Sequence, residues 1–388
     1  MTRKILVLFG TRPEVIKLAP VIRALRRRPH EFVTRVVCTG QHREMAQQAL
    51  DAFSLRPDVV LDAMASAQSL GRLTGRLFDD IDRVLEAERP DWVLVQGDTT
   101  SAMTAAMCAF YRRIKVGHVE AGLRTHDRWS PFPEEVNRTI IGQVADLHFA
   151  PTARSADNLR RAGFPPDAIH VTGNTVVDAL LWAGEGLGDG MPDGLPADLA
   201  AFTAGRRLIL VTSHRRESFG EGLENICAAL LGTVERYPDS VVVYPVHLNP
   251  SVKEPVHRLL SAHPRIRLLG PVGYLPLVWL MQRSFCIFTD SGGIQEEAPS
   301  LGKPLLIMRE TTERPEVVEA GCARLVGADS ARIQSAAREL FENPGAYAAM
   351  ASVKNPFGDG HASQRIVDLL LSAERNREDV AAPSRRTA

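Results

Sequence analysis

The chain has 388 residues, which is more than one hydrophobic core usually serves and predicts two domains. Its 46 basic and 46 acidic residues give a formal net charge of +0, which argues against nucleic acid or an anionic membrane surface as a partner. No apolar run approaches the roughly 20 residues that span a bilayer, and the N-terminal stretch MTRKILVLFG is typical of a first strand rather than a signal peptide.

The cysteines favour a cytoplasmic location. There are five, at positions 38, 108, 227, 286 and 322, and they are widely spaced and lack CxxC or metal-ligand spacing. This pattern is typical of reduced core residues in a cytosolic protein. The histidines show no HExxH or His/Asp spacing either, so we predict no metal site.

The first strand and turn predict a ligand-binding edge. The apolar run 5–9 is followed by Gly-Thr-Arg-Pro-Glu and a helix to about residue 28. Arg12 and Lys17 fall just beyond the carboxyl end of that strand, the edge where doubly wound sheets bind ligands. Either residue alone could be a solvated surface charge. The turn is not GxGxxG, which argues against a dinucleotide fold.

Three carboxylates follow the next predicted strands of the same half. Asp98 comes just after the strand 92–96, Glu120 directly follows the strand 115–119, and Glu134 opens a helix after the Pro-rich loop HDRWSPFPEE. Carboxylates gathered at one edge can perturb each other's pKa, which suits acid–base chemistry. Asp98 could equally be an N-cap residue.

The pattern of alternating strands and helices repeats after a segment rich in Gly, Asp and Pro at 183–196, so the domain boundary is expected between about 173 and 196. In the second half, the strand 208–211 ends in Thr-Ser-His214-Arg215-Arg216. A histidine there could assist a leaving phosphate near neutral pH, and His247 has the equivalent place one strand further on. A surface run of salt-bridged charges is the alternative.

The stretch 285–316 is predicted as strand, tight turn, helix and strand. Gly292 and Gly293 would let backbone N–H groups approach an anion at the helix start, and Glu297 could reach hydroxyls beside it. A phosphate beside vicinal hydroxyls indicates a nucleotide or nucleotide sugar. The alternative is a turn that needs its glycines only for packing.

The predicted fold is α/β, with two Rossmann-like doubly wound domains. The first spans residues 1–173 and is joined by a C-terminal helix at about 361–375. The second spans 174–360, and residues 376–388 are expected to be a disordered tail because they are charged and rich in Ala and Pro.

Several motifs, in order, resemble the non-hydrolysing UDP-N-acetylglucosamine 2-epimerases: GTRPEVIK, TGQHREM, QGDTT, GHVEAGLRT, SPFPEEVNR, VTGNTVVDAL, SHRRESFGEG, YPVHLNP and TDSGGIQEEAPSLGKP with ERPE. The likeness runs from residue 4 to about residue 372. It implies a GT-B-like architecture with an interdomain cleft, a homodimer, and chemistry that uses neither NAD nor a metal. It also implies interconversion of UDP-GlcNAc and UDP-ManNAc, which supplies ManNAc for cell-surface polysaccharides.

The resemblance further implies elimination of UDP to a 2-acetamidoglucal, followed by re-addition. Asp98, Glu120 and Glu134 match the family's required carboxylates, with the C2 base left open, and His214 matches the histidine that assists departure. The positions matching substrate-binding residues are Arg12, Lys17, Ser291, Gly292, Gly293, Glu297 and Arg314.

Many bacterial members of that family are activated by UDP-GlcNAc in a second pocket. Gln41, Gln68, Glu134, Arg215 and His247 match residues that line it, whereas positions 44, 67 and 272 (Glu, Ala and Val) depart from residues seen in some members. The alternatives are a GT-B glycosyltransferase, a hydrolysing epimerase and a catalytically silent nucleotide-sugar binding protein. The retained carboxylates argue against the first and the last of these.

Overall fold

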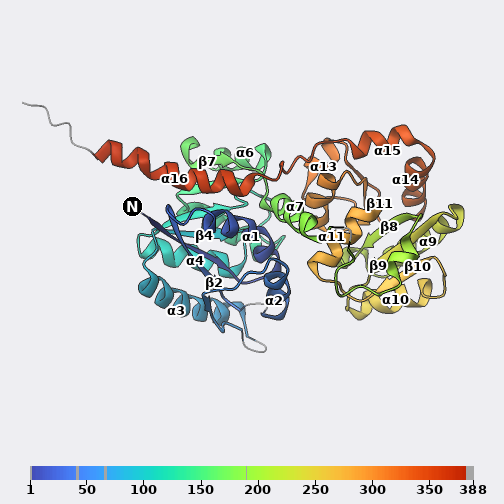
Figure 1. The fold of residues 1–388 in the computed structure, drawn as a ribbon, viewed down its shortest axis with the longest axis horizontal. Helices are drawn as coiled ribbons and strands as arrows, with labels where there is room; N and C mark the ends of the chain where they lie inside the picture. The colour runs from blue at the N-terminus through green and yellow to red at the C-terminus, as the bar shows by residue number, and fades with distance from the viewer. Residues whose placement is uncertain (1, 41–42, 65–67, 189, 382–388) are drawn as a thin grey trace, which may run out of the picture. The chain divides into compact units, whose positions relative to one another are not determined.

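The computed structural model of the protein describes residues 2–40, 43–64, 68–188 and 190–381 (Figure 1). The chain forms two compact units. Unit 1 contains the residues up to Ala179 together with those from Phe357 onward, and unit 2 is Leu180–Pro356.

Unit 1 is built on a seven-stranded parallel sheet with strand order β3-β2-β1-β4-β5-β6-β7. Its strands are β1 (Arg3–Phe9), β2 (Phe32–Cys38), β3 (Val59–Val60), β4 (Trp92–Gln96), β5 (Lys115–Val119), β6 (Leu147–Ala150) and β7 (Ile169–Val171). Its helices are α1 (Arg12–Arg26), α2 (Arg43–Ala52), α3 (Leu70–Glu88), α4 (Thr100–Tyr111), α5 (Glu134–Val144), α6 (Ala153–Arg161), the 3-10 turn η1 (Pro166–Ala168), the start of α7 (Thr175–Leu187), and α16 (Ala362–Ala381).

Unit 2 contains a six-stranded parallel sheet with strand order β10-β9-β8-β11-β12-β13. The strands are β8 (Arg207–Thr212), β9 (Ser240–Pro245), β10 (Ile266–Leu269), β11 (Ser284–Thr289), β12 (Leu305–Ile307) and β13 (Ala323–Leu325). The helices are α8 (Leu199–Thr203), α9 (Glu221–Arg236), α10 (Pro250–Leu260), α11 (Tyr274–Arg283), α12 (Gly292–Glu297), α13 (Pro315–Glu319), α14 (Ser330–Glu342) and α15 (Pro344–Ala351), with 3-10 turns η2 (Arg216–Ser218) and η3 (Ala298–Leu301).

The central strands are apolar because helices cover both faces of each sheet. In unit 1 every residue of 5–9 is fully buried, and β4 is buried throughout; β8 and β11 have the same character in unit 2. The predicted α/β class with two doubly wound parallel sheets is confirmed. In both sheets the order in which successive strands are added reverses beside the first strand, between β1 and β4 and between β8 and β11. In such sheets, ligands bind at the carboxyl ends of strands flanking that point.

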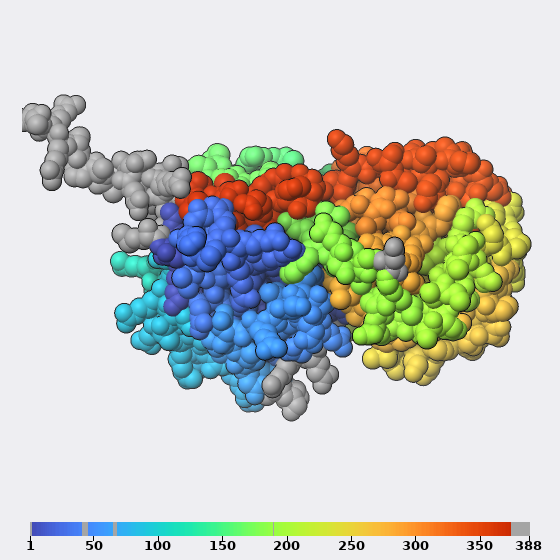
Figure 2. All heavy atoms as spheres, viewed as in Figure 1, coloured from blue at the N-terminus to red at the C-terminus, as the bar shows by residue number. Residues whose placement is uncertain are grey.

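The last helix returns to unit 1. It lies along α1, as the red and blue atoms show in Figure 2, and Arg28 pairs with Asp368 at 2.5 Å. The Arg3 guanidinium donates to the carbonyls of Leu370 and Leu371, each at 2.8 Å. Helix α16 begins near the expected residue 361 but continues beyond the expected end near residue 375.

The chain passes from unit 1 to unit 2 between residues 179 and 180, inside α7, and returns to unit 1 between residues 356 and 357. The bounds expected from the sequence were 173 and 360. Contacts with the returning chain explain both positions. The Asn174 N–H donates to the Phe357 carbonyl at 2.6 Å, and the Asp178 carboxylate accepts from the Ser363 N–H at 2.7 Å. The first turn of α7 is thereby fastened to unit 1.

Within the described residues, no helix combines the length and the apolar character that crossing a membrane requires.

Candidate functional site

A buried ion pair lies at the carboxyl edge of the unit 1 sheet. Lys17, from α1, pairs with the Glu120 carboxylate, and their side chains are 11% and 6% exposed. The Asn174 amide donates to the same Glu120 oxygen at 3.1 Å, and the Gln96 amide donates to the other oxygen. One ammonium group and two amides, from three separate segments, therefore bind one carboxylate. Together they compensate this carboxylate for the loss of its hydrating water.

The backbone at Glu120 is unusual. Its φ is 63°, in the left-handed region that residues with a side chain seldom adopt and that costs about 1–3 kcal/mol. Two residues later Gly122 has φ 91°, and a Cβ there would lie 2.2 Å from the Ser155 carbonyl oxygen, so only glycine fits. The turn after β5 is strained in a way that turns the Glu120 side chain inward, and strain of this kind is concentrated at functional sites.

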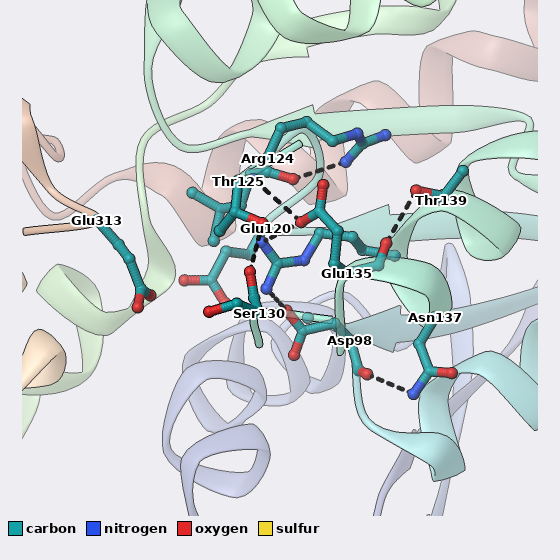
Figure 3. A network of polar contacts seen from close by, with 12 residues as sticks. Asp98, Glu120, Arg124, Thr125, Ser130, Glu135, Asn137, Thr139 and Glu313 are labelled. Carbon is teal, nitrogen blue, oxygen red and sulfur yellow. Dashed lines mark hydrogen bonds and ion pairs between the residues drawn. The ribbon is translucent and has the colours of Figure 1, made fainter. Parts of the chain in front are cut away.

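Asp98 follows β4 and pairs with Arg138 of α5 at 2.5 Å. Arg138 also contacts the Glu135 carboxylate at 3.2 Å, and the Asn137 amide donates to the Asp98 carbonyl at 2.9 Å (Figure 3). Burial raises the pKa of Asp98; Arg138 and Lys17 oppose this rise, and the charge of Glu134 adds to it. Of the three carboxylates expected at this edge, Asp98 and Glu134 are near enough to interact electrostatically, and Lys17 also acts on Asp98.

Glu134 opens helix α5 and has one carboxylate oxygen that accepts no hydrogen bond from any described residue although it is buried. Its neighbour Glu135 is fully engaged instead, because its two oxygens accept from the N–H groups of Thr125 at 3.1 Å and His126 at 3.0 Å (Figure 3). A buried acceptor without a protein donor is costly unless a ligand supplies one. This oxygen of Glu134 thus has capacity for a further hydrogen-bond donor.

Glu14 was not predicted as a site residue. Its carboxylate is 1% exposed and accepts from the Gly10 N–H at 3.0 Å, the Thr11 N–H at 2.8 Å and the Thr99 hydroxyl at 2.7 Å. Burial raises its pKa, and these hydrogen bonds oppose the rise. Glu14 joins the turn that carries Arg12 to the turn that carries Asp98. The capping-box spacing of Thr11 and Glu14 could have indicated the contact between these two residues. No sequence pattern indicates the hydrogen bond from Thr99.

In unit 2, His214 follows β8 and is 39% exposed at its side chain. Its Nδ1 lies 3.3 Å from the Asp290 carboxylate, and its ring stacks on His247 with centroids 5.8 Å apart. Burial lowers the pKa of His214; Asp290 opposes this, whereas Arg215 and His247 lower it further. The predicted neighbourhood of His214, Arg215 and His247 is present. Asp290 was not predicted as a site residue.

The glycine turn of unit 2 lies against Arg314. A Cβ added at Gly292 would lie 3.2 Å from the Arg314 Cζ, and the Arg314 Nε donates to Glu296 at 2.9 Å. The Ser291 N–H donates to the Thr289 hydroxyl at 2.9 Å. The N–H groups of Gly292 and Gly293, in the first turn of α12, have no acceptor within the helix, as at any helix start. Because α12 has only six residues, the expected helix-dipole contribution to anion binding is weak.

The remaining predicted residues fall in both units. Glu297 is buried at 5% exposure, and its carboxylate accepts from the Tyr274 hydroxyl at 2.7 Å, a partner the sequence did not indicate. Arg12 is the first residue of α1 and is half-buried. Gln68, in unit 1, donates to the Ala63 carbonyl at 3.0 Å. Gln41 lies outside the described residues.

Each of the two α/β units has charged side chains at the carboxyl edge of its parallel sheet, where the strand order reverses. This arrangement is typical of α/β enzymes that bind nucleotides. The family model described as UDP-N-acetylglucosamine 2-epimerase matches residues 23–371. The chain belongs to the UDP-N-acetylglucosamine 2-epimerase family, and the family prediction drawn from the motifs is confirmed.

Individual relatives cover nearly the whole chain. The UDP-N-acetylglucosamine 2-epimerase of Salmonella typhimurium is 50% identical over 95% of this chain and 98% of its own length. That of Escherichia coli K12 is also 50% identical, over 95% and 98%. The crystal structure of the Neisseria meningitidis UDP-GlcNAc 2-epimerase bound to UDP-GlcNAc has a TM-score of 0.85, at 45% identity over 95% of this chain and 100% of that one.

Proposed function

We propose that the protein interconverts UDP-GlcNAc and UDP-ManNAc by inverting C2 of the sugar without net hydrolysis. Family membership and the UDP-GlcNAc carried by the Neisseria meningitidis relative support this substrate. The observation that carries the proposal is the group of carboxylates at one edge of the unit 1 sheet. Glu120 is buried and paired with Lys17, the partly exposed Asp98 is paired with Arg138, and one buried oxygen of Glu134 accepts no hydrogen bond from the described residues.

The reaction needs a base and an acid on opposite faces of C2. A carboxylate takes the C2 proton, the C–H electron pair becomes the C1–C2 double bond, and the bond from C1 to the diphosphate oxygen breaks to release UDP. Re-addition reverses these steps with the proton delivered to the other face of the 2-acetamidoglucal. Asp98 suits this exchange, because burial, together with the charge of Glu134, raises the pKa of its carboxyl. Glu134 would supply the second carboxyl.

UDP must be held while it is detached from the sugar. In the proposal, the N–H groups of Gly292 and Gly293, the Ser291 hydroxyl and Arg314 contact the diphosphate, and His214 assists its departure. Glu297 binds the ribose hydroxyls. Arg12 and Lys17 contribute positive charge from unit 1. Preorganised donors of this kind stabilise the charge that develops on the leaving group.

Three further expectations belong to the same proposal. Gln41, Gln68, Arg215 and His247 would line a second, activating UDP-GlcNAc pocket. The enzyme would be a homodimer, which the molar mass measured by light scattering during gel filtration tests. It would reside in the cytosol, an expectation supported by five buried cysteines that form no disulfide with one another.

The decisive experiment is incubation with UDP-GlcNAc alone in D2O, followed by NMR of the sugar. Proton removal and return from solvent should place deuterium at C2 of both UDP-GlcNAc and UDP-ManNAc. Absence of deuterium would overturn the epimerase proposal. Accumulation of free ManNAc with UDP would instead indicate a hydrolysing enzyme.

We expect Glu297→Ala to weaken UDP binding about 10- to 100-fold, because hydrogen bonds to a charged group are each worth about 1.5–3 kcal/mol. Isothermal titration with UDP measures the effect. Glu342→Ala is the control, since that carboxylate lies in an exposed pair with Arg236 on the unit 2 surface. A dissociation constant for UDP that is unchanged in Glu297→Ala would refute the ribose assignment.

A further inference from the structure

Asp290 is a fully buried carboxylate at the point where the strand order of the unit 2 sheet reverses. It directly follows β11 and is 0% exposed. A carboxylate removed from water is expensive unless hydrogen bonds and an opposite charge compensate it. Its surroundings therefore indicate what it is for.

One oxygen of Asp290 binds the turn after the neighbouring strand β8. It accepts from the Ser213 hydroxyl at 2.9 Å, the His214 N–H at 2.8 Å and the Arg215 N–H at 2.8 Å. These donors are three consecutive residues, so the carboxylate fixes the backbone on both sides of His214. Loops that follow adjacent strands are thereby joined through a single side chain.

The other oxygen faces the His214 ring. It lies 3.3 Å from Nδ1 and accepts no hydrogen bond within the described part of the chain. A proton on Nδ1 would satisfy it. The ring would then present Nε2 on its opposite side, in the same relation by which a buried carboxylate orients a catalytic imidazole in hydrolytic triads.

We propose that Asp290 is a positioning residue that holds His214 with its Nδ1–H toward the buried carboxylate and favours the protonated ring, whose Nε2–H serves the departing diphosphate. This rests on the proposed function. The proton that Nε2 shares with the diphosphate oxygen on departure returns on re-addition, so the enzyme is unchanged after a full cycle. The groups that act electrostatically on the ring are Asp290, Arg215 and His247, and Asp290 is the one that favours protonation.

The first test is independent of turnover. Histidine side-chain NMR of the 15N-labelled enzyme, with His214→Asn used for assignment, should show the neutral His214 protonated on Nδ1. In Asp290→Asn the titration midpoint of His214 should fall by about one pH unit or more, because a neighbouring charge of opposite sign is worth about 1–3 units. A proton on Nε2 in the wild-type enzyme, or an unchanged midpoint in the variant, would overturn the proposal.

Asp239→Asn is the matched control. Asp239 pairs with Arg207 at 2.8 Å at the amino edge of the same sheet, whereas His214 lies at the carboxyl edge. Asp239→Asn therefore removes an equal charge far from His214. The titration midpoint of His214 should be unchanged in this variant. An equal fall in both variants would mean that the effect is not specific to Asp290.

The second test is kinetic. Asp290→Asn should lower kcat about 10- to 100-fold with little change in KM, and it should move the basic limb of the kcat profile to lower pH, since an imidazole with a lower pKa loses its proton earlier. In a His214→Asn background the same substitution should cost no further activity. A further loss as large as in the wild-type background would assign Asp290 a purely structural role. If the wild-type enzyme fails the deuterium test, the NMR experiment still decides whether Asp290 orients His214.

Discussion

Replacement of Asp98 by Asn should lower kcat by about 10²- to 10⁴-fold, the range that a positioned acid or base contributes, while UDP affinity changes less than about threefold. Asp98 lies at the carboxyl end of β4 in unit 1, whereas the proposed diphosphate and ribose contacts of Ser291, Gly292 and Glu297 are in unit 2. The amide is nearly isosteric with the carboxylate but can neither take nor return a proton. Single-turnover NMR in D2O should show deuterium incorporation slowed by the same factor.

The pH dependence provides a second measurement on Asp98. Burial raises the pKa of its carboxyl, so the form that accepts a proton is lost at a higher pH than for a free aspartate. The acid limb of kcat/KM should therefore lie above the ordinary aspartate value of about 3.9, and Asp98→Asn should remove it from any residual activity.

Asp91→Asn is the matched control for Asp98→Asn. Asp91 lies just before the opposite end of the same strand, where its carboxylate accepts from the Lys4 N–H at 2.7 Å, a contact that an amide oxygen can keep. Turnover should be unaffected. If Asp98→Asn lost UDP affinity in proportion to kcat, its place beside the sugar would be contradicted.

Lys17→Met should be the most destabilising of these substitutions, by about 3 kcal/mol, because it removes the positive charge of Lys17 from a buried ion pair. The amides of Gln96 and Asn174 would still donate to Glu120, but neither carries charge. Unfolding by urea, followed by circular dichroism, measures the loss. Turnover should fall as well, because Lys17 is proposed to contribute positive charge for the diphosphate.

A double variant separates the two effects of Lys17. Lys17→Met with Glu120→Gln removes both charges, so most of the lost stability should return while turnover stays low. Arg258→Met is the control for an exposed pair: Arg258 and Glu224 are 61% and 54% exposed, and such pairs are worth less than about 1 kcal/mol. A double variant no more stable than Lys17→Met would show that the uncompensated charge of Glu120 was not the cause.

The sequence predicted well those features that depend on local pattern and topology. The apolar runs 5–9, 92–96 and 115–119 predicted parallel strands. Because parallel strands end at one edge of a sheet, Lys17, Asp98 and Glu120 could be grouped from the sequence. The order of the motifs then identified the family. The boundary inside α7 was less accessible, because it depends on the bond from Asn174 to a carbonyl near the far end of the chain.

Features that depend on packing between distant segments were missed. Glu14 bonds to Thr99 and Asp290 bonds to Ser213, in each case across adjacent strand ends that are far apart in the chain. No periodicity marks such a contact, because a buried acid reads in sequence as a turn or cap residue. The positive φ of Glu120 was equally invisible, since a non-glycine residue gives no local sign of it.

The return of α16 to unit 1 has a consequence for synthesis on the ribosome. Unit 2 is one continuous segment, whereas unit 1 needs residues from both sides of it. Arg3, Arg28 and Asp178 find their partners in the returning segment only after all of unit 2 has been translated. Because domains generally fold as units during translation, unit 2 can complete its fold first. The half of the enzyme that leaves the ribosome earliest is thus completed last, and its partly covered α1 is the surface that chaperones would meet in the interval.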